Sequence, residues 1–307
     1  MKTLVTLQIT IFFLTFTGFL FRRIGIISKE GQKNVTDLVI YLVLPCNIFK
    51  SFLANEAGSQ IFSFLSILLI SFGIEIFSVI FSKIVYRHES TGRRKCLQYA
   101  TICSNAGFLG TPFAEGLFGS QGLLLATIYL IPVRIFMWSE GLAIFTGNKN
   151  IKKTIIKVVT HPCIIACFSG ILFMLMGWKL PAGLMGAVTL FGQCNTALSM
   201  MVIGMILAQI DLRELLDGKV LRFSLFRLII IPAVVLIVCR FLPINNTVLS
   251  LCVLLAAMPA GATTSILAEK YQVESPFATK LVVLSTLLSL PSIALWNLVL
   301  HYGFHLL

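Results

Sequence analysis

The sequence predicts an all-α integral membrane protein of about ten transmembrane helices. Three observations support this prediction: a mean hydropathy of +0.95, a charged fraction of only 12%, and a series of apolar runs along the chain. A soluble domain carries about twice that fraction of charge. No polar block is long enough to form a separate soluble domain, so we expect a single membrane domain over residues 1–307.

Each apolar run is close to the ~20 residues that a helix needs to cross ~30 Å of hydrocarbon. The runs cover 4–21, 35–53, 61–85, 96–118, 121–145, 158–177, 182–209, 220–241, 246–268 and 276–300. The first run is too long for the apolar core of a signal peptide, and it lacks a small-residue cleavage site. We therefore interpret it as the first permanent span.

The basic residues predict the orientation. Of the 24 Lys and Arg residues, only Lys2, Lys50, Lys179 and Arg240 fall on the side that holds the termini, and two more lie inside spans. All the others fall on the opposite side. Because cytoplasmic loops concentrate positive charge, both termini are expected outside the cytoplasmic (inner or plasma) membrane. The net charge of +12 is thus a topology signal in a lipid-embedded chain, and no nucleic-acid partner is expected.

An internal repeat is indicated by sliding the sequence against itself by 152 residues. The matched positions include Gly18 with Gly170, Phe21 with Phe173, Thr111 with Thr263, and Ala126-Thr127 with Ala278-Thr279. Repeat 1 would cover about 1–148 and repeat 2 about 153–303, with five spans each. Five is odd, so the second repeat would enter the membrane from the opposite side, as in many secondary transporters. Chance matching of common residues is the alternative.

Span 4 is expected to break near mid-membrane. Its candidate site residues are Asn105, Gly107, Gly110, Thr111 and Pro112. Proline removes a backbone donor and clashes with the preceding turn. Thr111-Pro112 is also typical of a helix start, with threonine as the cap and proline at the first position. We predict two half-helices with an unwound joint.

Span 9 carries a matching interruption. Its candidate site residues are Pro259, Gly261, Thr263 and Thr264. Paired Gly/Pro interruptions in two halves are the best sequence indication of a midplane binding site. Half-helix N-termini suit an anion, and C-terminal carbonyls suit a cation. Two independent proline kinks are the alternative interpretation.

Four charged residues fall inside spans, where charge is costly and usually functional or paired. Arg134 is predicted to bind an anionic substrate, and a structural pair, for instance with Glu140, is the alternative. Glu75 and Arg227 are related by the repeat shift, which favours an ion pair between them. Two other roles stay open: Glu75 as a proton carrier, and Arg227 reaching to the cytoplasmic face.

Three segments resemble the auxin efflux carrier family: 42–49 in span 2, 105–112 followed by 117–119 in span 4, and 256–261 followed by 268–271 in span 9. The resemblance covers about residues 1–300. It implies two inverted five-helix repeats, with spans 4 and 9 crossing at their broken centres. It also implies a scaffold of spans 1, 2, 6 and 7 and a moving bundle of the others. Asn105, Pro112 and Pro259 map onto the crossover, whereas Arg134 is not carried over from the family.

The resemblance also implies cargo, since bacterial members are associated with malate, malonate and related carboxylates, and plant members export auxin. We therefore expect a secondary permease for a small organic anion that works by alternating access. No nucleotide-binding, catalytic or metal motif is present, so neither an enzyme nor a cofactor is expected, although coupling to H⁺ or Na⁺ is open. The alternatives are a sodium-coupled bile-acid-like symporter, a carrier of a neutral solute, or a membrane receptor. A homodimer is also left open.

Overall fold

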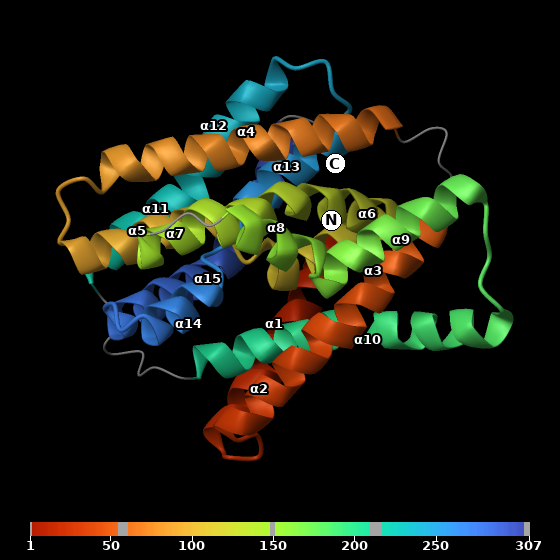
Figure 1. Ribbon diagram of the computed structural model, residues 1–307, viewed down its shortest axis with the longest axis horizontal. Helices are drawn as coiled ribbons and strands as arrows, with labels where there is room; N and C mark the ends of the chain where they lie inside the picture. Colours follow the sequence, from red (N-terminus) through yellow and green to blue (C-terminus); the bar gives the residue numbers. More distant parts are fainter. Residues whose placement is uncertain (1, 55–60, 148–150, 209–216, 304–307) are drawn as a thin grey trace.

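The computed structural model describes residues 2–54, 61–147, 151–208 and 217–303, and all regular secondary structure within them is helical (Figure 1). Six stretches are long and apolar enough to cross a membrane: Lys29–Leu53, Phe62–Val85, Ala106–Thr146, Ala182–Leu207, Gly218–Arg240 and Ser275–Tyr302. Pro162–Met176 and Asn246–Ala256 are shorter apolar helices. These helices confirm the all-helical membrane class. The count of ten spans stays a prediction.

The first half of the chain forms α1 (Lys2–Arg23), α2 (Lys29–Leu38), η1 (Val39–Val43), α3 (Leu44–Leu53), α4 (Ile61–Val85), α5 (Thr91–Ile102), η2 (Ala106–Gly110), α6 (Thr111–Phe136), η3 (Met137–Gly141) and α7 (Leu142–Thr146). The η elements are π-helical turns, which join α2 to α3 and α6 to α7 without a break. Within α6 the backbone leaves helical geometry at Gly119, with φ 62° and ψ −149°. This kink lies between the predicted end of span 4, at residue 118, and the predicted start of span 5, at residue 121.

The second half forms α8 (Ile151–Val159), α9 (Pro162–Met176), α10 (Ala182–Leu207), α11 (Gly218–Leu225), η5 (Phe226–Ile230), α12 (Ile231–Arg240), α13 (Asn246–Ala256), α14 (Thr263–Lys270), α15 (Ser275–Leu298) and η6 (Val299–Gly303). The run predicted at 158–177 differs from the structure, because its first residues belong to α8. His161 caps a new helix there by accepting the Cys163 N–H at its Nδ1 (3.3 Å), and Pro162 suits the first turn.

Three prolines follow π-helical turns. Pro45, Pro112 and Pro232 each occupy the second position of the α-helix that continues from η1, η2 or η5. A π-turn shifts the hydrogen-bond register, and proline has no N–H to complete the ordinary ladder. At these prolines the hydrogen-bond register therefore changes without the helix ending.

Two helix pairs pack with very little space between them. α1 lies along α10, and α3 lies along α9. A Cβ added at Gly204 would lie 1.8 Å from the Thr15 carbonyl oxygen, and one at Gly18 would lie 2.1 Å from the Met201 carbonyl oxygen. A Cβ at Gly170 of α9 would lie 2.7 Å from the Phe52 ring of α3. Glycine lets the backbones approach closely, as is common between helices in membranes.

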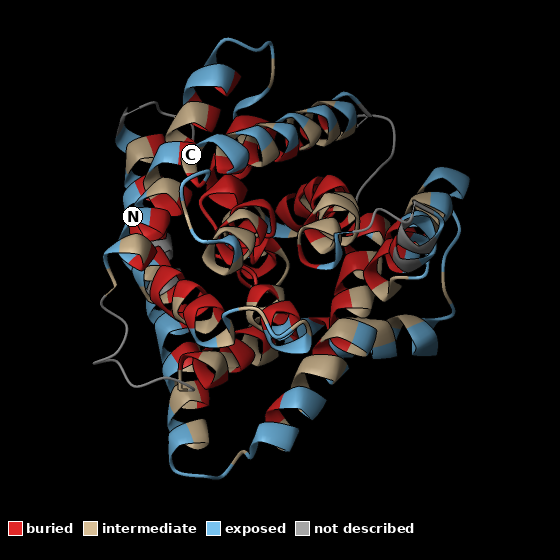
Figure 2. Cartoon of the chain, turned by 60° about the vertical axis from the view of Figure 1, so that its left-hand side comes forward, coloured by how far each residue is buried: buried red, intermediate tan, exposed pale blue. Residues whose placement is uncertain are grey.

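Large apolar side chains are exposed on many of the helices. Figure 2 shows that the buried residues concentrate where helices face one another. The exposed ones include Phe12, Phe13 and Phe16 on α1 and Leu65 and Leu69 on α4. An exposed apolar surface this extensive is unsuited to water and suits lipid.

Charged residues connect the ends of α4 and α11. Glu89, in the turn after α4, accepts hydrogen bonds from Lys219 and from Arg222 Nη2 (2.8 Å). The hydrogen bond from Lys219, together with the charges of both cations, lowers the pKa of Glu89. The contact therefore stabilises the fold above the carboxyl's unfolded pKa, and the stabilisation is lost as pH falls through the lowered value.

Candidate functional site

The two interrupted segments meet each other through their main chains. The Asn105 N–H donates to the Pro259 carbonyl (2.8 Å), and the Gly261 N–H donates to the Cys103 carbonyl (2.8 Å). Ser104 and Ala260 lie between them as an isolated antiparallel β-bridge. Backbone groups freed from helices inside a membrane must find partners. Here each broken segment supplies partners for the other.

The first break lies nearer the N-terminus than the sequence predicts. α5 ends at Ile102, and the chain is helical again from Ala106. α6 does begin at Thr111 with Pro112 in its first turn, as expected, but it continues from the π-turn η2, which contains Gly107 and Gly110, so the chain is not unwound there. The Thr111 hydroxyl donates to the Gly107 carbonyl (2.6 Å), so it satisfies a carbonyl within a continuing helix. The break moves because residues 103–105 find their hydrogen-bond partners across the crossover.

The second break matches the prediction. α13 ends at Ala256, and α14 begins at Thr263. The Thr263 hydroxyl points to Met137 Sδ (4.0 Å), which places η3 beside the start of α14. Thr264 is fully buried, and its hydroxyl oxygen has no hydrogen-bond partner. The crossover thus brings together two C-terminal helix ends, of α5 and α13, and two N-terminal ends, of η2 and α14.

Arg227 binds both C-terminal ends. Its Nε donates to the Met258 carbonyl (3.0 Å), and its Nη1 donates to the Thr101 carbonyl (3.4 Å). The side chain is 3% exposed, which excludes the alternative that it reaches the cytoplasmic face. A cation at these carbonyls complements the negative ends of both helix dipoles. Sequence reasoning identified Arg227 as a buried charge but missed this contact, which depends on the crossover geometry.

Glu75 of α4 is also buried and lies within electrostatic range of Arg227. The pair is not among the ion pairs closer than 4.0 Å in the described part of the chain, so its attraction acts over a longer distance. One carboxylate oxygen of Glu75 is buried without a hydrogen-bond partner. The structure therefore places a buried carboxyl group within electrostatic range of the guanidinium that holds the crossover, without a direct ion pair.

Arg134 lies in the last turn of α6 and is 7% exposed. Its Nη1 is buried without a hydrogen-bond partner. The guanidinium lies within electrostatic range of His161, Cys163 and Cys167, at the cap and in the first two turns of α9. Arg134 is also one helical turn from Met137, the residue that touches Thr263. A cation and a helix N-terminus together favour an anion.

Glu140 has a different neighbour. Its Oε1 is 2.6 Å from Lys83 Nζ, which links η3 to the end of α4. This contact joins two elements on the predicted cytoplasmic side. The sequence left open a coupling role or a structural charge pair for Glu140, and the contact with Lys83 favours the structural charge pair.

A polar cluster lies between α3 and α6, and the sequence did not predict which residues meet in it. The Asn47 Nδ2 donates to Glu115 Oε2 (2.9 Å), and Lys50 Nζ is 3.7 Å from Glu115 Oε1. Asn47 is fully buried, and its Oδ1 has no hydrogen-bond partner. An amide in an apolar run was the available signal, but only the tertiary contact shows that Asn47 and Glu115 meet.

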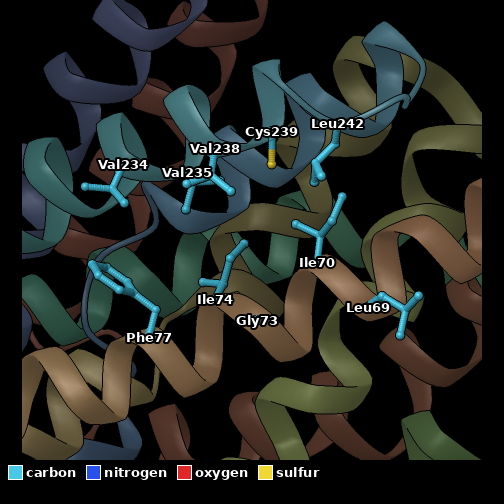
Figure 3. A pocket seen from close by; sticks show the side chains of 10 residues that line it. All are labelled: Leu69, Ile70, Gly73, Ile74, Phe77, Val234, Val235, Val238, Cys239 and Leu242. Carbon is cyan, nitrogen blue, oxygen red and sulfur yellow. The ribbon is translucent and has the colours of Figure 1, made fainter.

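The apolar groove between α4 and α12 has a volume of about 360 Å³ and lacks groups that could bind an anion (Figure 3). Its lining consists of Leu69, Ile70, Gly73, Ile74, Phe77, Val234, Val235, Val238, Cys239 and Leu242. Among the described residues, no cluster of three metal-ligating side chains occurs. The polar groups around the crossover are therefore the better candidate site.

An apolar helical bundle with two interrupted helices joined at their breaks defines a membrane transport protein as a class. The chain belongs to the membrane transport protein family, the auxin efflux carrier family that its motifs resemble, and the family model matches residues 3–151 and 148–297. This is a family of transporters and not of enzymes.

Three relatives are similar over almost their whole length. An uncharacterized transporter of Methanothermobacter thermautotrophicus is 27% identical over 95% of this chain and 97% of its own. One of Methanocaldococcus jannaschii is 26% identical over 94% and 96%. The uncharacterized transporter YfdV of Escherichia coli is 22% identical over 91% and 92%. The chain is thus an integral membrane transporter.

Proposed function

We propose that the chain is a secondary permease for a small organic anion, with a carboxylate group, and that it works by alternating access at the crossover. The observation that carries the proposal is the main-chain pairing of the two breaks, through Asn105 with Pro259 and Gly261 with Cys103. This pairing leaves two helix N-termini, of η2 and α14, close together. Their combined dipoles favour a negative charge.

Arg134 supports a carboxylate as the bound group. A buried guanidinium with an unpartnered Nη1 can donate to a carboxylate, and its five donors match that geometry. His161 and Cys163, at the start of α9, lie within electrostatic range of this guanidinium. The proposed site therefore extends from Arg134 past Met137 to Thr263 and the crossover.

The packing supports an inverted repeat of two five-helix units. α1 packs on α10, and α9 packs on α3. Under a shift of 152 residues, α1 corresponds to α9, and α10 corresponds to the α2–α3 helix. The α1–α10 contact in one repeat order therefore corresponds to the α9–α3 contact in the other. Gly18 and Gly170, which are 152 residues apart, occupy equivalent places at the two close approaches. Units related in this way suit two alternative states that are related by a pseudo-two-fold rotation and open to opposite sides.

The contacts of Arg227 indicate which ion is coupled to transport. Its guanidinium hydrogen-bonds the carbonyls that would otherwise coordinate a cation at the C-terminal helix ends. This contact favours coupling to H⁺, with Glu75 as the carrier, over a sodium-coupled mechanism at that place. In proteoliposomes, uptake should then respond to a pH gradient and not to replacing Na⁺ by K⁺.

The test is flux of labelled malonate and malate into proteoliposomes containing the full chain. Wild type should transport at least one of them. Arg134→Gln should raise KM by about 10- to 100-fold, the loss expected for a hydrogen bond between charged groups. Arg240→Gln removes an exposed charge elsewhere and should leave KM unchanged.

Normal affinity in a folded Arg134→Gln protein would exclude the substrate role of Arg134. Absence of flux for every organic anion tried would contradict the permease. Binding without flux would instead favour a membrane receptor.

A further inference from the structure

We propose that Asn47 and Lys50 form an anion subsite that the chain's own Glu115 carboxylate occupies, and that the transported anion displaces Glu115. The inference rests on the proposed function, because it assumes that the cargo carries a carboxylate. It adds a residue, Glu115, whose role is to compete with that cargo.

The donor set is suited to a carboxylate. Asn47 Nδ2 and Lys50 Nζ approach different oxygens of the same Glu115 carboxylate, at 2.9 and 3.7 Å. An amide N–H and an ammonium on one carboxylate satisfy both its charge and its hydrogen-bonding needs. A cargo carboxylate of the same shape would find the same two donors.

The donors are fixed in place. Asn47 is fully buried, and α10 closes against its backbone, since a Cβ at Gly192 would lie 3.1 Å from Asn47 Cα. The Asn47 Oδ1 has no partner, so the amide uses only its donor side. A buried amide held in this way is preorganised for an acceptor that arrives from one direction.

Glu115 is the more easily displaced partner. Its distance to Lys50 is longer than a hydrogen bond, and the Lys50 and Glu115 side chains keep 21% and 26% of their surface exposed. Ion pairs of this partly exposed kind are weak. The ion pair with Lys50 therefore adds little to the hold on Glu115, and a competing carboxylate has mainly the Asn47 hydrogen bond to replace.

The position of the contact relates it to transport. Asn47 and Lys50 belong to α3, which packs against α9 and α10, whereas Glu115 is one turn after Thr111 in the half-helix that leaves the crossover. The contact thus joins the two groups of helices that would move relative to each other. Displacing Glu115 would also release that link.

The test compares the stabilisation of full-length protein in nanodiscs by malonate, with malonamide as the neutral control. A tethered competitor reduces apparent affinity by the fraction of time that it occupies the subsite. Glu115→Asp keeps the charge but shortens the side chain, so the carboxylate no longer reaches Asn47. We expect it to lower the half-saturating malonate concentration about tenfold, which is the gain if Glu115 occupies the subsite nine-tenths of the time.

Two further variants complete the design. Lys50→Gln should raise the half-saturating concentration, and adding it to Glu115→Asp should remove most of the gain. Glu30→Asp, an exposed glutamate on α2, is the matched control and should behave as wild type. Unfolding temperatures without ligand verify that each variant is folded.

The outcomes separate the two proposals. If malonate binds and is transported, but Glu115→Asp binds it as wild type does, the subsite is wrong and the permease stands. If neither malonate nor malate stabilises any folded variant, including Glu115→Asp, the subsite and the carboxylate cargo are both wrong. A tenfold gain that malonamide shares equally would also contradict the subsite.

Discussion

Two buried charges, Glu75 and Arg227, show how a single residue can organise the crossover. Arg227 hydrogen-bonds carbonyls from two different half-helices, and Glu75 provides the nearby negative charge. A buried cation is costly unless it is paired and hydrogen-bonded. Here the two helix ends accept its hydrogen bonds and Glu75 lies within electrostatic range, so we infer that stability depends on all three together.

Arg227→Met should therefore destabilise the protein by about 2–5 kcal/mol, because it leaves the Met258 and Thr101 carbonyls without their charged donor and removes the cation near Glu75. Adding Glu75→Gln should recover part of the loss, since the uncompensated charge is removed while the carbonyls remain unpaired. The measurement is thermal unfolding in detergent as a double-mutant cycle. Arg240→Met, at an exposed position, serves as the control. Strictly additive effects of the two substitutions would show that the charges act independently.

At the scale of the element, the helices differ from simple rods in two ways that the residues explain. Prolines follow π-turns at Pro45, Pro112 and Pro232, so they shift the hydrogen-bond register within continuous helices. Glycines mark the places where helix backbones nearly touch, as at Gly204 against Thr15. Not every glycine marks such a contact: Gly186 of α10 has open space around it, so its lack of a side chain is not needed for packing.

Gly204→Ala should consequently destabilise the α1–α10 pair, by about 1–3 kcal/mol if the helices can shift to relieve the overlap. Gly186→Ala adds the same methyl group to the same helix without a clash, and should be neutral or slightly stabilising because alanine favours helix. Unfolding temperatures of the two variants, measured side by side, provide the comparison. Equal effects would mean that the close approach of α1 and α10 contributes nothing to stability.

At the scale of the whole molecule, the charge distribution and the apolar surface together describe a chain embedded in lipid. Exposed aromatic and aliphatic side chains cover its outer helices, while charged contacts such as Glu89 with Arg222 connect helix ends. Those ends belong to the side where the sequence concentrates Lys and Arg. The molecule thus combines an asymmetric distribution of basic residues between its two predicted sides with an apolar, lipid-facing outer surface.

The orientation can be measured with fusions. Because cytoplasmic loops concentrate positive charge, we expect green fluorescent protein to be fluorescent when attached after residue 147 and dark when attached at the C-terminus. Alkaline phosphatase at the same two positions should show the reverse activities. Fluorescence from the C-terminal fusion would contradict both termini being outside.

The predictability of the site differs from residue to residue. The second break was located correctly from Pro259 and Gly261, since local backbone chemistry decides where that helix ends. The first break was misplaced by several residues, because Pro112 is accommodated by a π-turn and the actual opening is stabilised from across the crossover. The contact of Asn47 with Glu115 was missed, because the two residues are far apart in the sequence.

The sequence by itself determined the helical membrane class, the approximate spans, the charge asymmetry and the existence of two interruptions. All of these follow from local composition, since transfer into lipid depends on the residues within one span. Only the tertiary structure decided that the interruptions pair with each other, that Arg227 holds both helix ends, and which carboxylate faces Asn47. Each of these is a contact between distant segments, and its free energy depends on packing geometry that no local pattern encodes.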